Sequence, residues 1–514
     1  MLQLSSLALV GVADPGNVAN ANRLVATDES QKSVERWEYY EIVLRGPAEG
    51  NPFVDVSLSA TFKLKNRSVT VGGFYDGEAI YKVRFMPDDL GSWTYTTASN
   101  KPELDAKTGV FLCTSPGDRN HGPVSVRDSY HFGYADGTPY VECGTTCYAW
   151  AFQAEETQRQ TLQTLSASPF NKLRMCIFPK WYQHNRSEPP MYPFPRSADR
   201  NDYSRFNVDY FKHLDHLIGE LRAIGVQADL ILFHPYDKWG YQSMPPEVDD
   251  RYLRYVVARY SAFRNVWWSQ ANEFDLLKSK TNTDWDRLAS ILQEEDAYGH
   301  LRSIHYSHHV YEYGRAWCSH AGVQDAHFEY AASWRADWKK PLVYDECQYE
   351  GNIASNWGNI PGDEMTRRFW LATVQGAYAG HGETYLSDRD ILWWSHGGVL
   401  HGSSPAKIAF LRSMLEETIA KGDGPIGFTA YPSGSTLGAK RENNSVVFYY
   451  FDVHAPAEAN LPLPEGMSYA AEYIDTLKLT RRSLAGTYSG KAELKLPGTP
   501  FGSVWFTALE TGKT

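Results

Sequence analysis

Short apolar runs alternate with longer helix-periodic runs along the middle of the chain, and this alternation restricts the fold more than any other feature. Residues 172–178, 228–233 and 341–344 are apolar enough to form buried strands. Residues 208–224 carry apolar side chains at positions 208, 211, 214, 217, 218 and 221, which is the spacing of one helix face. Strands that alternate with helices indicate a parallel sheet covered by helices.

The alternation continues for eight steps over roughly 300 residues, which predicts one TIM (β/α)8 barrel. The expected strands cover residues 140–144, 172–178, 228–233, 266–268, 302–307, 323–328, 341–344 and 383–386. The expected helices cover residues 155–165, 208–224, 250–263, 285–298, 365–379 and 406–420.

On both sides of this region the apolar pattern changes to period two. Residues 54–60 alternate strictly, and Tyr81, Val83 and Phe85 share one face of a strand. Turns rich in Gly, Pro and Asp separate such runs, as they do in β-sandwiches. The same pattern returns towards the C-terminus. We therefore expect a β-sandwich over residues 1–122, the barrel over 123–423 and a second β-sandwich over 424–514.

The composition narrows the functional classes. The formal net charge is −11, whereas nucleic-acid-binding proteins carry a basic footprint, so no nucleic-acid partner is expected. No apolar run reaches 18 residues, so no membrane span is expected. The cysteines form no CxxC pair, and we expect neither a metal nor a cofactor.

The first residues lack Lys or Arg ahead of a weak apolar run, which favours a cytoplasmic location. The sequence does not determine the oligomeric state.

Two glutamates stand at the ends of predicted strands. Asn272-Glu273 follows the fourth strand and Asp345-Glu346 follows the seventh. Active sites of (β/α)8 barrels lie at the carboxyl ends of strands, so both side chains are expected at the barrel mouth. An isolated Asn-Glu pair is more often an ordinary helix start, but two strand-end glutamates are what a retaining glycosidase requires. Asp345 and Glu350 are rivals of Glu346, although neighbouring residues of a strand point to opposite faces.

An ordered set of short motifs runs through most of the chain: GGFYDG, YKVRFMP, GSWTY, DGTPY, NEFD, DECQYEG and AGHGETY. Together they resemble the apiosidase-like group of (β/α)8 glycoside hydrolases, in the form flanked by a small β-sandwich on each side. The resemblance implies a retaining glycosidase that acts on a plant or microbial oligosaccharide or glycoside. It implies Glu273 as the acid/base and Glu346 as the nucleophile. One departure is Cys347, which stands where a proline or glycine often flanks the nucleophile.

Further residues near predicted strand ends are candidates for binding a carbohydrate substrate. Asn272 is expected to hydrogen-bond the sugar 2-hydroxyl. Aromatic rings offer faces on which sugar C–H groups pack, and 14% of the chain is aromatic. The other candidates are His234, His305, His308, His327, Tyr385, Trp394, Trp150 and Trp239. A lone strand-end histidine is more often structural, and Trp394 with its neighbour Trp393 is also compatible with a place in the core.

Two other interpretations stay open at this point. The chain can be a non-catalytic carbohydrate-binding protein on a barrel scaffold, although degenerate barrels usually lose one of the two carboxylates. The second alternative is a metal-dependent hydrolase that uses the histidines near the fifth strand, His305, His308 and His309. A metal site of this kind needs three ligands in suitable geometry. Because adjacent His308 and His309 alternate faces, we favour one histidine in the pocket and no metal.

Overall fold

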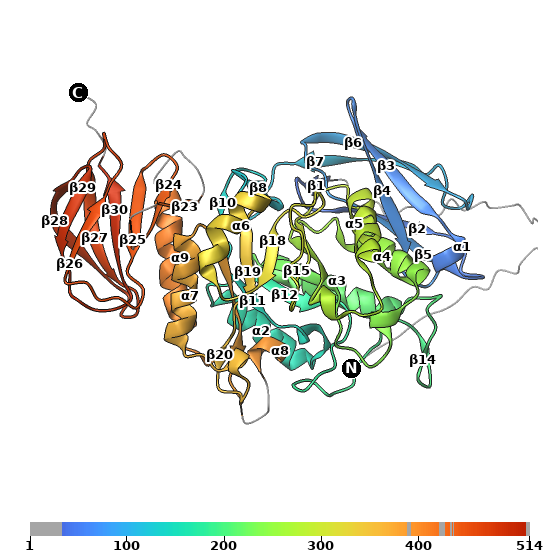
Figure 1. Ribbon diagram of the computed structural model, residues 1–514. Helices are drawn as coiled ribbons and strands as arrows, with labels where there is room; N and C mark the ends of the chain where they lie inside the picture. Colours follow the sequence, from blue (N-terminus) through green and yellow to red (C-terminus); the bar gives the residue numbers. More distant parts are fainter. Residues whose placement is uncertain (1–32, 388–391, 421–426, 432–433, 435, 510–514) are drawn as a thin grey trace, which may run out of the picture.

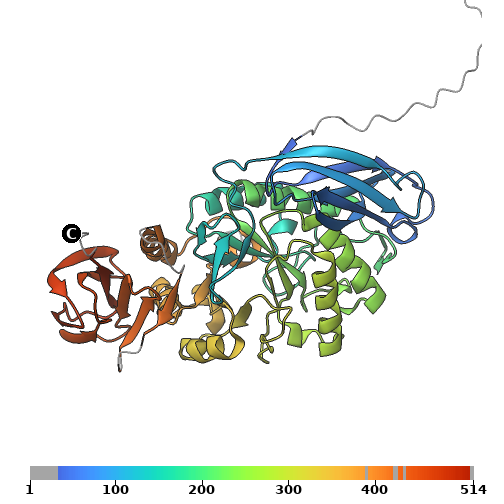
Figure 2. The same ribbon diagram turned by 90° about the horizontal axis from the view of Figure 1, so that it is seen from above.

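The computed structural model describes residues 33–387, 392–420, 427–431, 434 and 436–509. The chain forms a β-rich N-terminal unit, a central unit of strands and helices, and a β-rich C-terminal unit (Figure 1). In both views the two β-rich units lie on opposite sides of the central one (Figures 1 and 2). The expected boundary at residue 423 and all residues before 33 lie outside the described ranges.

The central unit is built around an eight-stranded, barrel-like parallel sheet. Its spatial order is β17-β16-β15-β12-β11-β21-β19-β18. The strands are β11 (Gly144–Thr146), β12 (Lys172–Cys176), β15 (Gln227–Phe233), β16 (Val266–Ala271), β17 (Arg302–Ser303), β18 (Ala321–Gln324), β19 (Leu342–Glu346) and β21 (Tyr378–His381). All residues of β15 and β16 are buried, as expected for parallel strands that are covered on both faces.

The two edge strands, β17 and β18, approach each other through serine side chains. The Ser303 hydroxyl donates to the His320 carbonyl (2.9 Å) and accepts from the Gly322 N–H (3.0 Å). The Ser319 N–H donates to the Arg302 carbonyl at 2.8 Å. These bonds satisfy backbone groups at the two edges of the barrel-like sheet.

Helices cover the outside of this sheet. They are α2 (Glu155–Ser166), α3 (Val208–Ala223), α4 (Pro246–Tyr260), α5 (Asn282–Glu295), α6 (Ala331–Trp338), α7 (Gly362–Val374) and α9 (Ser404–Ala420), with the short α8 (Trp393–His396) before α9. The connection from β17 to β18, residues 304–320, contains no helix, so the expected eight strand–helix steps have one exception. Among the described helices, none combines the length and apolar composition needed to span a bilayer.

The positions of the first and eighth barrel strands differ from the prediction. Tyr140 pairs with Phe132 in a small antiparallel sheet of β8 (Val124–Arg127), β9 (His131–Tyr134) and β10 (Pro139–Tyr140), and the barrel strand begins only at Gly144. The predicted eighth strand contains β22 (Glu383–Thr384), which instead pairs with β20 (Glu350–Gly351). The true strand β21 has the sequence YAGH, in which Ala, Gly and His carry little strand preference, so the pattern did not reveal it.

The small antiparallel sheet closes the amino-terminal end of the barrel. The Phe132 ring packs 5.2 Å from Trp267 and 5.4 Å from Tyr378 between centroids, and Trp267 and Tyr378 stand at the beginnings of β16 and β21. These apolar contacts close the amino-terminal end, so the open end of the barrel is at the carboxyl ends of the strands.

The N-terminal unit is one seven-stranded sheet folded into two layers. Its order is β1-β7-β6-β3-β4-β5-β2. The strands are β1 (Ser33–Glu35), β2 (Tyr40–Arg45), β3 (Leu58–Leu64), β4 (Arg67–Tyr75), β5 (Ile80–Phe85), β6 (Gly91–Ser99) and β7 (Thr108–Thr114). β4 pairs with β3 up to Gly72 and with β5 from Gly73, so the sheet turns over at this glycine pair. Phe62 of β3 stacks on Phe85 of β5 at 4.1 Å inside the fold.

The prediction that residues 54–60 form one strand was wrong at its start. A helical turn, α1 (Pro52–Asp55), precedes β3. The Asn51 side chain accepts a hydrogen bond from the Phe53 N–H, and Pro52 occupies the first helical position. An Asn cap followed by Pro favours a helix start over a strand.

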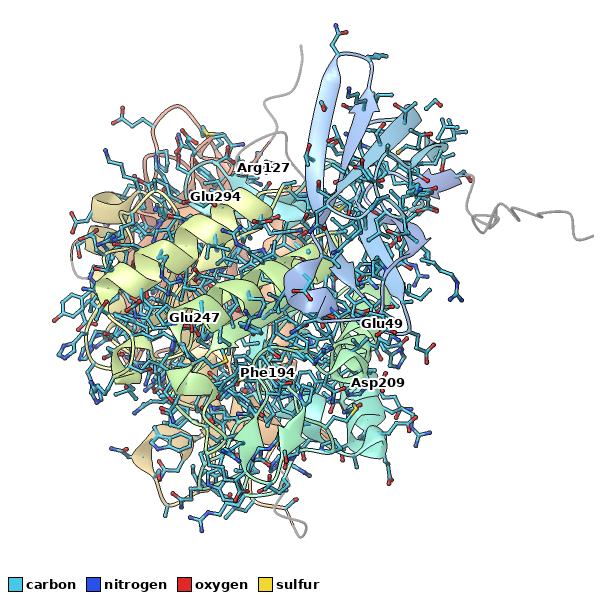
Figure 3. The ribbon with its side chains drawn as sticks, turned by 90° about the vertical axis from the view of Figure 1, so that its right-hand side faces the viewer. Glu49, Arg127, Phe194, Asp209, Glu247 and Glu294 are labelled. Atoms are coloured by element: carbon cyan, nitrogen blue, oxygen red, sulfur yellow. The ribbon has the colours of Figure 1, made fainter. Side chains whose placement is uncertain are left out.

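A buried ion network joins the N-terminal unit to the central one. Arg84 of β5 contacts Asp215 of α3 at 2.8 Å, and Arg259 of α4 contacts the same carboxylate at 2.6 Å. Arg259 also contacts Asp76 at 2.9 Å. The N-terminal unit lies beside helices α3, α4 and α5, marked in Figure 3 by the labels Asp209, Glu247 and Glu294. The Asp215 carboxylate therefore pairs with one guanidinium from each unit.

The C-terminal unit consists of a six-stranded sheet that faces a two-stranded ribbon across its own apolar core. The sheet order is β23-β24-β25-β30-β27-β28. The strands are β23 (Phe428–Ala430), β24 (Leu437–Arg441), β25 (Val446–Tyr450), β27 (Tyr469–Asp475), β28 (Thr480–Tyr488) and β30 (Gly502–Ala508), with β26 (Glu458–Pro462) and β29 (Lys491–Lys495) in the ribbon. Trp370 of α7 stacks on Tyr450 at 5.5 Å, which attaches this unit to the barrel helices.

We expect Asp215→Asn to lower the free energy of unfolding by about 3–5 kcal/mol, because Arg84 and Arg259 lose a buried counter-charge while the shape is kept. Urea unfolding followed by tryptophan fluorescence measures this loss. Asp88→Asn is the matched control, since its partner Arg67 is 44% exposed and the loss there should stay within about 1 kcal/mol. Equal effects of the two variants would contradict the assigned role of Asp215.

Candidate active site

A cavity of about 500 Å³ lies at the carboxyl ends of the barrel strands. Residues that end or follow seven of the eight strands line it, several of them in the long loops after β12 and β19. The lining residues are Tyr148, Lys180, Tyr182, Gln183, His184, Tyr236, Asn272, Glu273, Gln324, Asp325, Ala326, Glu346, Gln348, Tyr349, Ser355, Trp357 and Trp394. All of them belong to the central unit.

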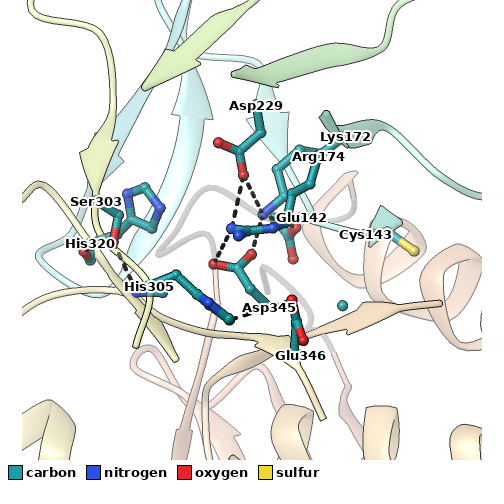
Figure 4. Close-up of polar contacts among 12 residues, drawn as sticks. Glu142, Cys143, Lys172, Arg174, Asp229, Ser303, His305, His320, Asp345 and Glu346 are labelled. Atoms are coloured by element: carbon teal, nitrogen blue, oxygen red, sulfur yellow. Dashed lines mark hydrogen bonds and ion pairs between the residues drawn. The ribbon is translucent and has the colours of Figure 1, made fainter. Parts of the chain in front are cut away.

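Glu346, the last residue of β19, presents its carboxylate to this cavity. The Tyr148 hydroxyl donates a hydrogen bond to Glu346 Oε1. His305 Nε2 lies 3.9 Å from the same oxygen (Figure 4). Burial lowers the pKa of His305 to about 4, so the imidazole is neutral near pH 7. Glu346 is therefore held by a neutral hydroxyl donor beside a neutral ring.

Glu273 reaches the cavity from the turn directly after β16. Its backbone adopts φ 51° and ψ 54°, the left-handed region that non-glycine residues seldom occupy. The Asn272 amide donates to Glu273 Oε2 at 3.2 Å. Burial and the neighbouring Glu273 carboxylate raise the pKa of Tyr236 well above its usual range. Backbone strain of this kind is concentrated at functional sites.

A buried ion network adjoins Glu346 (Figure 4) and reaches the neighbour of Glu273. Arg174 of β12 contacts Asp345 at 3.0 Å and Asp229 at 3.4 Å, and it donates to Asn272 Oδ1 at 3.2 Å. Lys172 contacts Asp345 at 3.0 Å. Although burial opposes it, Arg174 and Lys172 hold the pKa of Asp345 well below its usual range. Asp345 thus has a structural partner set and lies outside the cavity.

Glu350, the other rival of Glu346, also lies outside the cavity lining. It is fully buried, and its carboxylate accepts hydrogen bonds from the backbone N–H groups of Ser403 (2.7 Å) and Ser404 (3.1 Å). Of the three carboxylates in and after β19, namely Asp345, Glu346 and Glu350, only Glu346 faces the cavity.

Lys180 brings a buried cation to the cavity wall. Its Nζ lies 3.9 Å from the Tyr148 ring centroid, 4.6 Å from that of Tyr236 and 5.4 Å from that of Trp394. Burial lowers the pKa of Lys180 despite the attraction of nearby carboxylates. Among the ion pairs of the described residues, none involves Lys180, so its ammonium group is available to polar groups of a bound molecule.

Four of the predicted site residues line the cavity together: Asn272, Glu273, Glu346 and Trp394. Trp394 packs 5.0 Å from Trp357, and both rings belong to the wall. His305 lies directly behind Glu346 rather than in the wall.

The other predicted histidines lie elsewhere. Both ring nitrogens of His234 are used internally, one towards the Phe178 carbonyl (3.0 Å) and one accepting from the Tyr236 N–H (3.2 Å). His308 is exposed and is held through its own backbone N–H by Asp275. His327 is exposed and bonds Asp325, which does line the cavity. His327 therefore touches only the rim.

The remaining aromatic candidates also lie outside the cavity lining. Trp150 is fully buried, and its indole N–H donates to the Gln158 carbonyl at 3.3 Å. The Trp239 indole donates to Glu188 at 2.9 Å. The Tyr385 hydroxyl donates to Glu350 at 3.2 Å. These three side chains have internal partners instead of facing the space that a substrate would enter.

No group of three potential metal ligands among the described residues includes His305, His308 or His309. Within the part of the chain that the structure describes, the interpretation of these histidines as a catalytic metal site has no geometric support.

Several cavity residues were not identified from the sequence, notably Lys180, Tyr148, Tyr236 and Tyr349. Each stands within a few residues of a strand end, in a loop without periodicity. Proximity to a strand end was the available signal, but it applies equally to many residues that point away from the cavity.

The comparisons with known proteins agree with this architecture. A candidate glycoside hydrolase from Bacteroides vulgatus ATCC 8482, solved by crystallography, is 34% identical and has a TM-score of 0.88; the match covers 93% of this chain and 100% of that one. A glycoside hydrolase family 5 structure from the same organism is 14% identical, with a TM-score of 0.60 over 76% of this chain and 94% of that one. The second likeness shows the fold alone. No curated protein matches this chain.

Three family models match along the chain. Residues 33–100 match a domain of unknown function, DUF5060, and residues 435–507 match another, DUF5605. Residues 127–398, more than half of the chain, match the model described as Apiosidase-like, catalytic domain. The chain therefore belongs to the apiosidase-like family, with DUF5060 and DUF5605 domains on either side of its catalytic domain.

Proposed function

We propose that this protein is a retaining glycoside hydrolase that cleaves an O-glycosidic bond by double displacement. One observation carries the proposal: Glu273 and Glu346, from the ends of strands β16 and β19, line the same aromatic cavity. A retaining glycosidase uses two carboxylates, one as the acid/base and one as the nucleophile. The relative from Bacteroides vulgatus that covers nearly the whole chain is itself described as a candidate glycoside hydrolase.

In the first step, Glu346 attacks the anomeric carbon while Glu273 donates its proton to the departing oxygen. The glycosidic bond breaks and an ester to Glu346 forms. In the second step, Glu273 takes a proton from water, which attacks the same carbon and releases Glu346. The Tyr148 hydroxyl holds Glu346 by a hydrogen bond, and the neutral His305 ring lies beside the same oxygen.

Support for a carbohydrate substrate comes from the cavity wall. Trp357 and Trp394 supply flat apolar faces, while Asn272, Gln324 and Lys180 supply polar groups. Asn272 uses its carbonyl oxygen for Arg174 and one amide hydrogen for Glu273. Its second amide hydrogen remains for a sugar hydroxyl, because the amide nitrogen carries two. We infer a plant or microbial oligosaccharide or glycoside as the substrate.

We also infer that the eight strands form a closed (β/α)8 barrel and that both β-rich units are β-sandwich domains, with boundaries near residues 122 and 423. The fold-over of the N-terminal sheet and the opposed sheet and ribbon of the C-terminal unit support this division.

A screen of aryl glycosides and plant polysaccharides tests the activity itself. We expect one glycoside class to be hydrolysed with retained anomeric configuration, which NMR of the first product detects. Saturable sugar binding by a folded protein that cleaves nothing would favour the non-catalytic interpretation.

The two glutamates should fail in different ways on an activated aryl glycoside found in that screen. In Glu273→Ala, bond cleavage survives because a phenolate needs little protonation, and the glycosyl-enzyme accumulates because water lacks its base. Azide, which needs no base, should then restore turnover and give a glycosyl azide of retained configuration. In Glu346→Ala, azide should give the inverted product. Reversed stereochemistry in the two variants would overturn the assigned roles.

Tyr148→Phe tests whether the hydrogen bond from the Tyr148 hydroxyl assists the proposed nucleophile, Glu346. Removing a hydrogen bond to a charged group costs about 1.5–3 kcal/mol, so we expect kcat/KM to fall roughly 10- to 100-fold. Tyr330→Phe is the matched control, because Tyr330 is 48% exposed and lies outside the cavity lining. Unchanged kinetics in Tyr148→Phe would show that this hydroxyl does not assist Glu346.

A further inference from the structure

Outside the cavity, Glu350, His381 and Glu383 form a second cluster of chemically reactive side chains. They come from β20, from the end of β21 and from β22, and all three are fully buried. One ligand atom from each lies within 4.8 Å of the other two. None of the three lines the cavity or takes part in the reaction proposed above.

The charges of this cluster are not balanced by a basic side chain. Among the described residues, neither Glu350 nor Glu383 forms an ion pair with Lys, Arg or His. Their donors are neutral: the N–H groups of Ser403 and Ser404 and the Tyr385 hydroxyl for Glu350, and the N–H groups of His401 and Gly402 for Glu383. Two adjacent buried carboxylates without a cation are costly. Asp345, by contrast, has both Lys172 and Arg174.

One ring nitrogen of His381 is buried and unsatisfied. Its Nδ1 lies 2.9 Å from the Thr145 hydroxyl, which also accepts from the Trp393 indole at 2.8 Å. Its Nε2 is buried and has no hydrogen-bond partner. A histidine oriented through one nitrogen with the other left free is typical of a metal ligand.

The backbone around the carboxylates supports the same interpretation. The N–H groups orient both carboxylates, as outer contacts of metal ligands do. A side chain at Gly402 would place its Cβ 2.5 Å from Glu350 Oε2 and 2.7 Å from Glu383 Oε2. The Ser404 hydroxyl is also buried without a hydrogen-bond partner, on the residue whose N–H donates to Glu350. The chain therefore encloses the cluster closely.

We propose that Glu350, His381 and Glu383 bind one divalent first-row transition cation, with zinc as the preferred ion. One imidazole nitrogen with two carboxylate oxygens suits zinc, whereas calcium prefers a shell of oxygens alone. Ligands of a tetrahedral zinc lie about 3.4 Å apart, and the three ligand atoms lie within 4.8 Å of one another, so the side chains need to close by up to about 1.4 Å. The ion joins β20, β21 and β22 to residues 401–404, where α9 begins.

The site is connected to the catalytic end of the barrel by a short stretch of chain and by hydrogen bonds. Glu350 lies four residues after Glu346, and His381 is linked through Thr145 to Trp393, the neighbour of the cavity residue Trp394. A cation at this position fixes the segments on which the nucleophile and the aromatic wall stand. Its role is structural and does not depend on the proposed reaction.

The test uses the full chain without a histidine tag. The protein is treated with EDTA, reloaded with zinc, manganese or calcium, and passed over a desalting column before elemental analysis. We expect about one equivalent of zinc in the wild type and less than about one tenth in Glu383→Gln and His381→Gln. His327→Gln is the matched control, because His327 is exposed, and it should retain the wild-type zinc content.

Thermal unfolding supplies a second measurement. Zinc should raise the Tm of the wild type and of His327→Gln by a few degrees, and it should not change that of Glu383→Gln. Gln has the shape of Glu and removes one of two adjacent buried charges, so Glu383→Gln should fold. Absence of zinc binding in the wild type, binding of calcium alone, or equal zinc in Glu383→Gln and the wild type would overturn the proposal.

Discussion

A single buried guanidinium, that of Arg174, joins the strands that carry the two glutamates of the cavity. It contacts Asp345, the neighbour of Glu346, and it donates to Asn272, the neighbour of Glu273. It also reaches Asp229 on β15. A buried charge that loses one of its partners is strongly destabilising, so this network couples the positions of strands β12, β15, β16 and β19. The geometry of the site thus depends on charges that no substrate touches.

The flanking units support the barrel without entering the site. Every residue that lines the cavity lies between positions 148 and 394, whereas the N-terminal unit attaches to α3 and α4 and the C-terminal unit to α7. Both attachments lie on helices outside the sheet. Loops at the strand ends therefore define the cavity, whereas the flanking units attach to the outer helices.

The cavity has a strained backbone at Glu273 and a buried charge at Lys180, which lies against aromatic rings. Glu273 keeps a left-handed backbone, and Lys180 keeps a buried ammonium group against tyrosine and tryptophan rings. Neither feature improves the stability of an isolated fold, since each costs free energy that packing elsewhere has to offset. Their coincidence with two strand-end glutamates in one cavity distinguishes a built site from an incidental cleft.

The sequence by itself determined the alternation of strands and helices, the β-rich character of both ends, and the placement of Glu273 and Glu346 at strand ends. Those features follow from local apolar periodicity, which is written along the chain. It did not reveal β21, because a YAGH strand has no apolar or β-branched signal, nor the helix-free connection between β17 and β18. Only the tertiary structure decided that His305 stands behind Glu346 while His234 is used internally, and that Trp394 faces the cavity while Trp150 is enclosed. Strands buried on both faces carry no alternation that reveals side-chain direction, and loop residues are oriented by partners distant in the sequence.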